Sequence, residues 1–145
     1  MDNNEKMIYD LIKVYLAQMD SAMKISKTIC EHSNRNELTG DDIICGLIYR
    51  LMKPMSQEEI DDSLQKAEDL LEDSTSEEEE YDCIEETYEI PKVTRKIQNI
   101  TCNCDICSDV RLCLINYKDH EVSDDLAHRF KKSIDETCKK HKIYI

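Results

Sequence analysis

Residues 35–43, which read RNELTGDDI, lie between two segments whose apolar residues recur at helical spacing. Arg35 and Asp42 stand seven residues apart, and Thr39 precedes Asp42 by three. The Thr39 hydroxyl can accept a hydrogen bond from the amide of Asp42, and the Asp42 carboxylate can accept one from the amide of Thr39. This capping box predicts a short loop that ends where a helix begins.

A long helix is predicted before this loop. Neither Gly nor Pro occurs between residue 6 and about residue 33, and apolar residues recur every three or four positions. At 3.6 residues per turn this is one helix of roughly seven turns. Its apolar face consists of Ile8, Leu11, Ile12, Tyr15, Leu16, Met19, Met23 and Ile29.

Two shorter helices are predicted after the loop. The first ends at Lys53-Pro54, because proline breaks a helix and restricts the residue before it. Ser56 and Glu59 form a second capping box, which opens the next helix. The two apolar stripes are Ile43, Ile44, Leu47, Ile48 and Leu51, and then Ile60, Leu64, Ala67 and Leu71.

This order of elements resembles the histone fold from its central helix onward, over about residues 6–72. In that family an Arg and an Asp seven residues apart clamp the second loop, so the resemblance implies a clamp of Arg35, Thr39 and Asp42. Leu38 takes the apolar loop position, whereas Gly40 replaces the usual proline. The first helix and first loop of the family are missing. An ordinary helical hairpin without this kinship is the alternative.

The resemblance also implies a partner. Histone folds pair by crossing two long helices, so we expect a homodimer or a histone-fold heterodimer. Tyr15, Met19 and Ile29 would lie on the pairing face, since an unpaired copy would leave such side chains exposed.

The net charge of −13 comes from the middle of the chain. Residues 56–90 carry sixteen acidic groups and one basic group, whereas the segments on either side are close to neutral. We therefore expect a helical domain at 1–72, a disordered acidic linker at 73–92 and a separate module at 93–145. The alternative for the linker is contact with basic proteins, as in histone chaperones, through Tyr81, Ile84 and Tyr88.

Closely spaced cysteines mark the third segment. Cys104 and Cys107 form a C-x2-C pair, and Cys138 and His141 form a C-x2-H pair near the end of a predicted helix. Zinc takes four such ligands in a tetrahedron, and a site with four protein ligands is structural. Cys102 and Cys113 are alternate ligands. In the competing interpretation, Cys113 and Cys138 are small core residues. His32, His120 and His128 are interpreted as isolated surface residues.

No catalytic triad, HExxH motif or Gly-rich phosphate loop is present, so we do not expect an enzyme. The expected function is a non-enzymatic protein–protein interaction module in transcription, chromatin-type or viral genome assembly. A virion structural or scaffold (minor capsid) protein is one alternative. A small zinc-dependent nucleic-acid-binding protein is another, using Lys131, Lys132, Lys139, Lys140 and Lys142.

The setting is expected to be intracellular, in the nucleus, the cytoplasm or a virion. No apolar run reaches the roughly 18 residues of a membrane span, and the N-terminus lacks the apolar region of a signal peptide. Lys outnumbers Arg and Ile is abundant, a bias typical of AT-rich genomes such as those of some viruses and protists.

Overall fold

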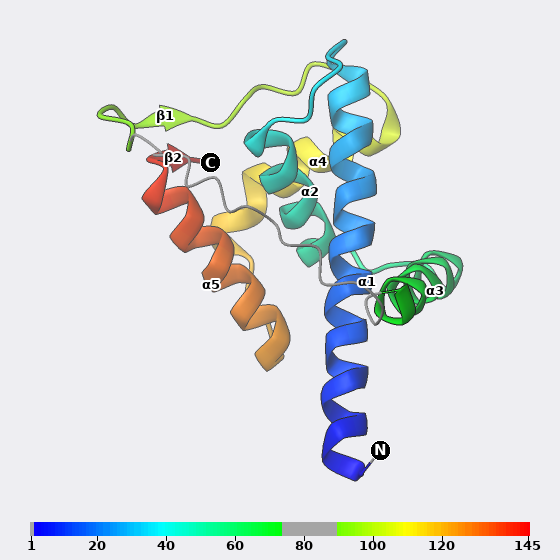
Figure 1. The fold of residues 1–145 in the computed structure, drawn as a ribbon. Coiled ribbons are helices and arrows are strands. Elements are labelled where there is room, and N and C mark those ends of the chain that lie inside the picture. The colour runs from blue at the N-terminus through cyan, green and yellow to red at the C-terminus, as the bar shows by residue number, and fades with distance from the viewer. Residues whose placement is uncertain (1, 74–89) are drawn as a thin grey trace.

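The structure is a computed structural model that describes residues 2–73 and 90–145. Helices make up most of these residues, which confirms the expectation of a mainly helical protein. The acidic contact segment with Tyr81, Ile84 and Tyr88 lies outside the described residues. In chain order the elements are α1 (Asn3–His32), α2 (Gly40–Met52), α3 (Gln57–Asp73), β1 (Arg95–Lys96), α4 (Asp105–Asn116), the 3-10 turn η1 (Tyr117–Asp119), α5 (Asp125–Lys140) and β2 (Ile143–Tyr144) (Figure 1).

The helical hairpin of α1 and α2 is packed closely at Gly46. A Cβ atom at this position would lie 2.1 Å from the Ser26 hydroxyl oxygen and 2.4 Å from the carbonyl oxygen of Ala22. Both α1 residues are small and buried, so the two backbones can approach here. The chain leaves α1 through Asn34, whose φ of 58° is a left-handed conformation that asparagine tolerates.

Helix α3 packs against α1 (Figure 1). The predicted capping box at its start is present, because the Glu59 amide donates to the Ser56 hydroxyl at 3.3 Å and the Ser56 amide donates to Glu59 at 3.4 Å. The buried guanidinium of Arg50 on α2 also donates to Glu59, at 3.0 Å. Glu59 thus both caps α3 and connects it to α2.

One hydrophobic core joins the two segments that the sequence divides into 1–72 and 93–145. Helices α4 and α5 pack against α2, and two isoleucines of the loop between β1 and α4 pack with them. β1 and β2 pair in parallel, with Arg95 opposite Ile143. The fully or nearly buried members of this core are Ile29, Ile44, Cys45, Ile48, Ile97, Ile100, Cys107, Val110, Cys113, Tyr117, Ile134 and Cys138.

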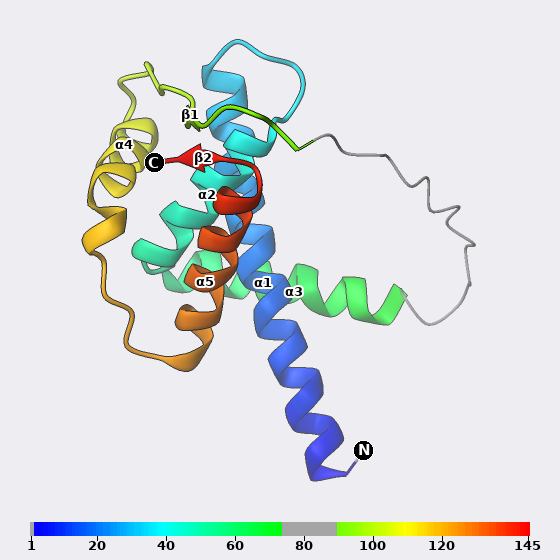
Figure 2. The same cartoon turned by 90° about the vertical axis from the view of Figure 1, so that its left-hand side faces the viewer.

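The N-terminal part of α1 projects away from this core (Figures 1 and 2). We call residues 3–14 the arm. Five of its aliphatic side chains are largely exposed: Met7 is 65% exposed, Ile8 57%, Leu11 52%, and Ile12 and Val14 are each 44% exposed. The arm ends where the Tyr15 ring stacks on Phe130 of α5, with the ring centroids 5.2 Å apart. No helix in the described ranges has the length and apolarity to cross a membrane.

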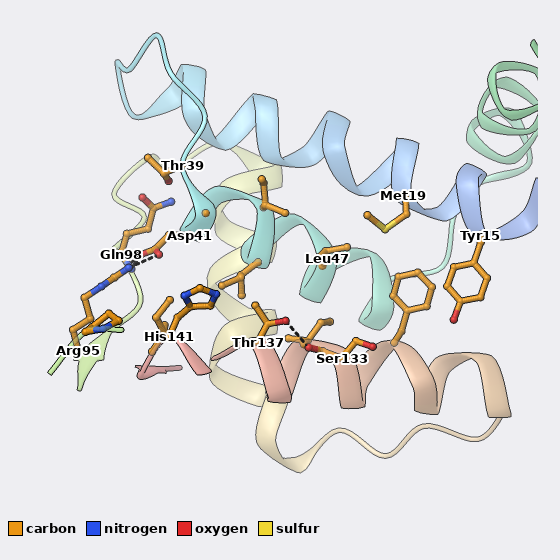
Figure 3. A pocket seen from close by; sticks show the side chains of 17 residues that line it. Tyr15, Met19, Thr39, Asp41, Leu47, Arg95, Gln98, Ser133, Thr137 and His141 are labelled. Atoms are coloured by element: carbon orange, nitrogen blue, oxygen red, sulfur yellow. Dashed lines mark hydrogen bonds and ion pairs between the residues drawn. The ribbon is translucent and has the colours of Figure 1, made fainter. Parts of the chain in front are cut away.

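An apolar groove of about 830 Å³ begins at the base of the arm (Figure 3). Tyr15 and Met19 of α1, Leu47 of α2 and Phe130 of α5 line one end. His141 and the ion pair of Asp41 with Arg95 lie at the other end (Figure 3). The groove therefore begins at Tyr15, directly after the last turn of the arm.

Candidate metal centre

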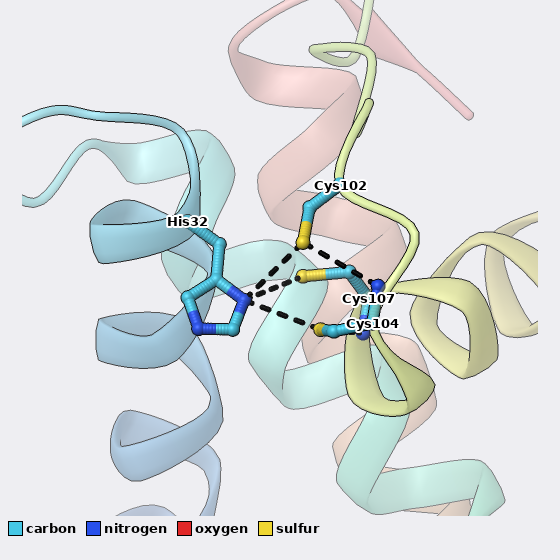
Figure 4. A group of neighbouring side chains, drawn as sticks. All are labelled: His32, Cys102, Cys104 and Cys107. Carbon is cyan, nitrogen blue, oxygen red and sulfur yellow. Dashed lines mark hydrogen bonds between the residues drawn. The ribbon is translucent and has the colours of Figure 1, made fainter.

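His32, Cys102, Cys104 and Cys107 gather at one point of the surface (Figure 4). His32 is the last residue of α1, whereas the cysteines belong to the loop before α4 and to its first turn. The imidazole Nδ1 and the three Sγ atoms all lie within 4.8 Å of one another. This group could hold a metal ion, and all seven cysteines that the structure describes are free thiols.

The distances within the group fit a tetrahedral ion. His32 Nδ1 lies 3.2 Å from Cys104 Sγ, 3.4 Å from Cys102 Sγ and 3.6 Å from Cys107 Sγ. With Zn–S bonds of about 2.3 Å and Zn–N bonds of about 2.0–2.1 Å, the nitrogen-to-sulfur edge of a tetrahedral zinc site is about 3.6 Å. The three nitrogen-to-sulfur distances therefore match this edge to within a few tenths of an ångström.

Local backbone geometry brings the three sulfurs together. Cys104 caps α4, and its sulfur accepts a hydrogen bond from the amide of Cys107 at 3.4 Å. The amide of Cys104 donates in turn to Cys102 Sγ at 3.5 Å. Arg111, one turn along α4, donates to the carbonyl oxygens of Ile100 and Cys102 and so holds the loop in place. Amide donors aimed at sulfur favour its thiolate form.

The thiols of the cluster differ in acidity. The amide of Cys107 is the largest influence on Cys104, and it outweighs burial to lower the pKa of that thiol to about 6. Burial, followed by the neighbouring sulfurs, raises the pKa of Cys107 above its ordinary value of 9.0. At neutral pH one thiolate is thus ready for a metal, whereas Cys107 must lose its proton when the metal binds.

The ligand set expected from the sequence is not the set that the structure brings together. Cys104 and Cys107 are in the cluster, and the alternate ligand Cys102 joins them. Cys138 instead follows Phe130 and Ile134 along the buried face of α5, and its thiol lies in the core. Placement of a helical residue on an apolar stripe directs it inward, so the competing interpretation as a core residue applies to Cys138.

The two other expected candidates also lie elsewhere. His141 follows the end of α5 and lines the apolar groove, and Cys113 is a core residue on α4. Neither offers an atom to the cluster.

His32 is the ligand that the sequence interpretation missed. The sequence pattern indicates an isolated surface histidine, because the closely spaced cysteines begin 70 residues further along the chain, at Cys102. The available signal is the run Cys102-x-Cys104-x2-Cys107, which supplies three sulfurs and lacks a fourth ligand. His32 stands three residues before the clamp residue Arg35, at a point where a helix was predicted to end.

The expected loop clamp is present beside the cluster. Arg35 donates two hydrogen bonds of 2.7 Å to the two carboxylate oxygens of Asp42. The Thr39 amide donates to Asp42 at 3.0 Å, and the Asp42 amide donates to the Thr39 hydroxyl at 3.3 Å. Burial would raise the pKa of Asp42, but Arg35, Thr39 and Gln98 outweigh it and lower that pKa to about 2. The carboxylate is therefore charged throughout the ordinary pH range.

A second clamp joins the start of α2 to the C-terminal half. Arg95 donates two hydrogen bonds of 2.8 Å to Asp41, and the Gln98 amide donates to the same carboxylate at 3.0 Å (Figure 3). The Gln98 side chain also bonds Asp42 and accepts from Arg35 at 3.0 Å. Asp42 thus holds the loop after α1, and the adjacent Asp41 holds the segment at Arg95. The sequence pattern did not indicate the contact of Arg95 with Asp41.

The residues expected on the pairing face lie in different surroundings. Ile29 is fully buried in the chain's own core, so it is not available to a partner, contrary to the expectation. Tyr15 is stacked on Phe130, while Met19 is 38% exposed at the groove. Of the lysines proposed for nucleic acid, Lys131 donates to the carbonyl oxygens of Tyr117 and His120 inside the C-terminal half.

Comparison of the chain with protein-family models, with curated proteins and with solved structures found no match.

Proposed function

We propose that this protein is a non-enzymatic interaction module, a histone-fold-like helical hairpin that binds a protein partner through the apolar face of its arm. The observation that supports this proposal is the exposure of Met7, Ile8, Leu11 and Ile12 on one projecting helix. Contiguous exposed aliphatic surface on a soluble chain is typical of an interaction site. Scattered single exposed residues would not carry this inference.

A partner would also stabilise the arm. The arm consists of about three turns, and most of the stability of a protein helix comes from tertiary packing of its apolar face. Its last turn contacts α3 through the ion pair of Lys13 with Glu68 at 3.6 Å, and the ring stack of Tyr15 on Phe130 follows directly after it. A second helix laid along the arm would cover the aliphatic face and extend into the groove at Met19. A second copy of this chain, or a histone-fold protein with a similar helix, has the required shape.

The proposed setting is transcription, chromatin-type or viral genome assembly, as the histone-fold resemblance implies. Support comes from the clamp of Arg35 with Asp42, which joins the long helix to the next one at the spacing typical of that family. A virion structural role remains the alternative, and it would use the same arm to join neighbouring subunits.

Zinc, held as a structural ion, is the metal included in this proposal. Thiolate sulfur and imidazole nitrogen are its usual protein ligands, whereas calcium and magnesium take oxygen. Four protein ligands would leave no open position for a substrate, so the ion would stabilise the fold rather than take part in a reaction.

The oligomeric state and its dependence on the arm test this proposal. Native mass spectrometry and light scattering of the wild type should show a dimer, or a stable complex with a partner recovered by affinity capture. Leu11→Glu places a carboxylate on the apolar face and should abolish either assembly. Lys6→Glu places the same carboxylate on the charged face of the arm and should leave the assembly intact. Equal assembly of Leu11→Glu and wild type would contradict the proposal.

A further inference from the structure

The cluster is built from two distant parts of the chain. Three ligands lie within six residues of one another, at Cys102, Cys104 and Cys107, whereas His32 lies 70 residues earlier at the end of α1. A cysteine cluster that folded by itself would take all its ligands from its own turn and helix. Here the fourth comes from the other half of the chain (Figure 4).

We propose that a Zn²⁺ ion bound by His32 Nδ1 and by the thiolates of Cys102, Cys104 and Cys107 acts as a clip that fastens the C-terminal half of the chain to the end of α1. This inference rests on the proposed function only in taking the metal to be zinc. It does not depend on the arm or on any partner. It assigns the ligands, the coordinating nitrogen and the structural effect of the ion.

The orientation of the imidazole supports the assignment. Nδ1, the nitrogen nearer to the backbone, faces all three sulfurs at 3.2 to 3.6 Å. A neutral imidazole nitrogen can form one good hydrogen bond. Hydrogen bonding therefore does not account for three sulfurs that face the same nitrogen. The same convergence is what a central tetrahedral ion requires.

The segment that runs from β1 into α4 is the part of the C-terminal half that the clip would hold in place. Residues 95–107 cross the ends of α1 and α2, and this crossing segment has two polar anchors. At its start Arg95 binds Asp41 through two bonds of 2.8 Å. At its end the cysteines meet His32. Ile97 and Ile100 are buried between these anchors, so the loss of either anchor would loosen one end of a packed segment.

Metal removal would take away the second anchor only. Without an ion, His32 keeps at most one weak hydrogen bond to a thiol, at a solvent-exposed position. The last turn of α1 and the first turn of α4 would then separate and exchange with solvent independently. A local cysteine site would show a different result, because removal of its metal would disturb residues near 102–107 alone.

The ligand assignment is tested by metal content and by cobalt substitution in the full-length chain. Wild type should bind one Zn²⁺ per chain by native mass spectrometry, and Co²⁺ should give the visible absorption of a tetrahedral site with thiolate ligands. His32→Ala should weaken the affinity by more than about 100-fold, because even outer-shell changes cost 10- to 100-fold. His32→Cys should keep tight binding, since a fourth thiolate is an equivalent ligand. His128→Ala, an exposed histidine on α5, is the matched control and should bind as wild type does.

The clip itself is tested by hydrogen exchange followed by mass spectrometry. Chelation of the metal should raise exchange at residues 29–35 as well as at residues 102–108. His32→Ala with zinc present should raise exchange in the same two ranges. Increased exchange confined to residues 102–108 would overturn the clip.

Two outcomes of the metal titration would also overturn it. One is equal zinc affinity and equal cobalt spectra of wild type and His32→Ala, and the other is a wild type that binds no zinc. Neither bears on pairing through the arm, because the effect of Leu11→Glu on assembly is measured separately.

Discussion

The two ends of α1 share one apolar periodicity but have opposite surroundings. Toward its C-terminus the helix is buried against α2, with Ser26 and Ile29 both 0% exposed. Toward its N-terminus Met7 and Leu11 are 65% and 52% exposed, although they continue the same helical periodicity. Periodicity therefore identifies a face that is stabilised by burial, but it does not tell whether the cover comes from the same chain or from another.

The difference between the ends follows from what each end can reach. The C-terminal end meets a helix that begins only eight residues later, and a polar clamp fixes the loop between them. The arm lies beyond the end of α2, and α3 reaches only its last turn, through the ion pair of Lys13 with Glu68. Substitutions at matched positions on the two ends test this difference.

The largest contrast is expected from truncating one aliphatic residue at each end. Ile29→Ala removes a fully buried side chain and should lower the free energy of unfolding by about 3 kcal/mol. Leu11→Ala should change it by less than about 0.5 kcal/mol, because its side chain is already half exposed. Urea unfolding at a concentration where the chain is monomeric measures both. Similar losses would mean that the arm is covered within the chain.

The close approach of α1 and α2 gives the next effect. Gly46→Ala would bring a methyl group against the carbonyl oxygen of Ala22, so we expect a loss of about 2–3 kcal/mol. Gly40→Ala is the matched control, since no heavy atom lies within 4 Å of the added Cβ. This control should be neutral or slightly stabilising at the first turn of a helix. A tolerated Gly46→Ala would show that the hairpin is not tightly packed.

The loop clamp should contribute a pH-dependent term. The pKa of Asp42 is lowered from 3.8 to about 2, so its stabilisation is complete above about pH 4 and is lost as the pH falls toward 2. Asp42→Asn should therefore cost about 2 kcal/mol at pH 7 and much less at pH 2. Asp10→Asn on the exposed arm is the control and should change stability by less than about 0.5 kcal/mol. An Asp42→Asn penalty that is independent of pH would contradict the clamp.

The helix caps should give the smallest contrast. Thr39→Ala removes the cap of α2 and should cost about 1 kcal/mol. Asp2→Ala removes the hydrogen bond of 2.8 Å from the Glu5 amide at the start of α1. Its cost in global stability should stay below about 0.5 kcal/mol, because the end of an unpacked arm frays without unfolding the core. Thermal unfolding gives the stabilities, and circular dichroism reports the lost helical turn. A larger cost for Asp2→Ala would show that the arm unfolds together with the core.

Short-range features of this chain could be predicted from its sequence. Both capping boxes and the contact of Arg35 with Asp42 join residues that are at most seven positions apart, so a local pattern determines them. The predicted apolar stripe of α2 also contains two buried isoleucines, Ile44 and Ile48. In each of these cases the physical cause lies within one or two helical turns.

Long-range features could not be predicted in the same way. The sequence placed Cys138 and His141 with Cys104 because both pairs have metal-ligand spacing, but the buried stripe of α5 carries Cys138 into the core. The meeting of His32 with the cysteines depends on how α4 packs against α2, which no spacing reports. The contact of Arg95 with Asp41 has the same origin. Spacing gives the type of ligand, whereas packing decides which ligands meet.

The unequal separation of the four metal ligands has a consequence for the order of assembly. Cys102, Cys104 and Cys107 need only a turn and the start of a helix to converge, and closing so short a loop costs little chain entropy. His32 can join the cysteines only after the hairpin and the C-terminal half have docked, because 70 residues of chain separate His32 from Cys102. A partly folded chain would therefore offer three sulfurs while the histidine is still distant. The bond between His32 and the metal would therefore form last, after the hairpin and the C-terminal half have docked.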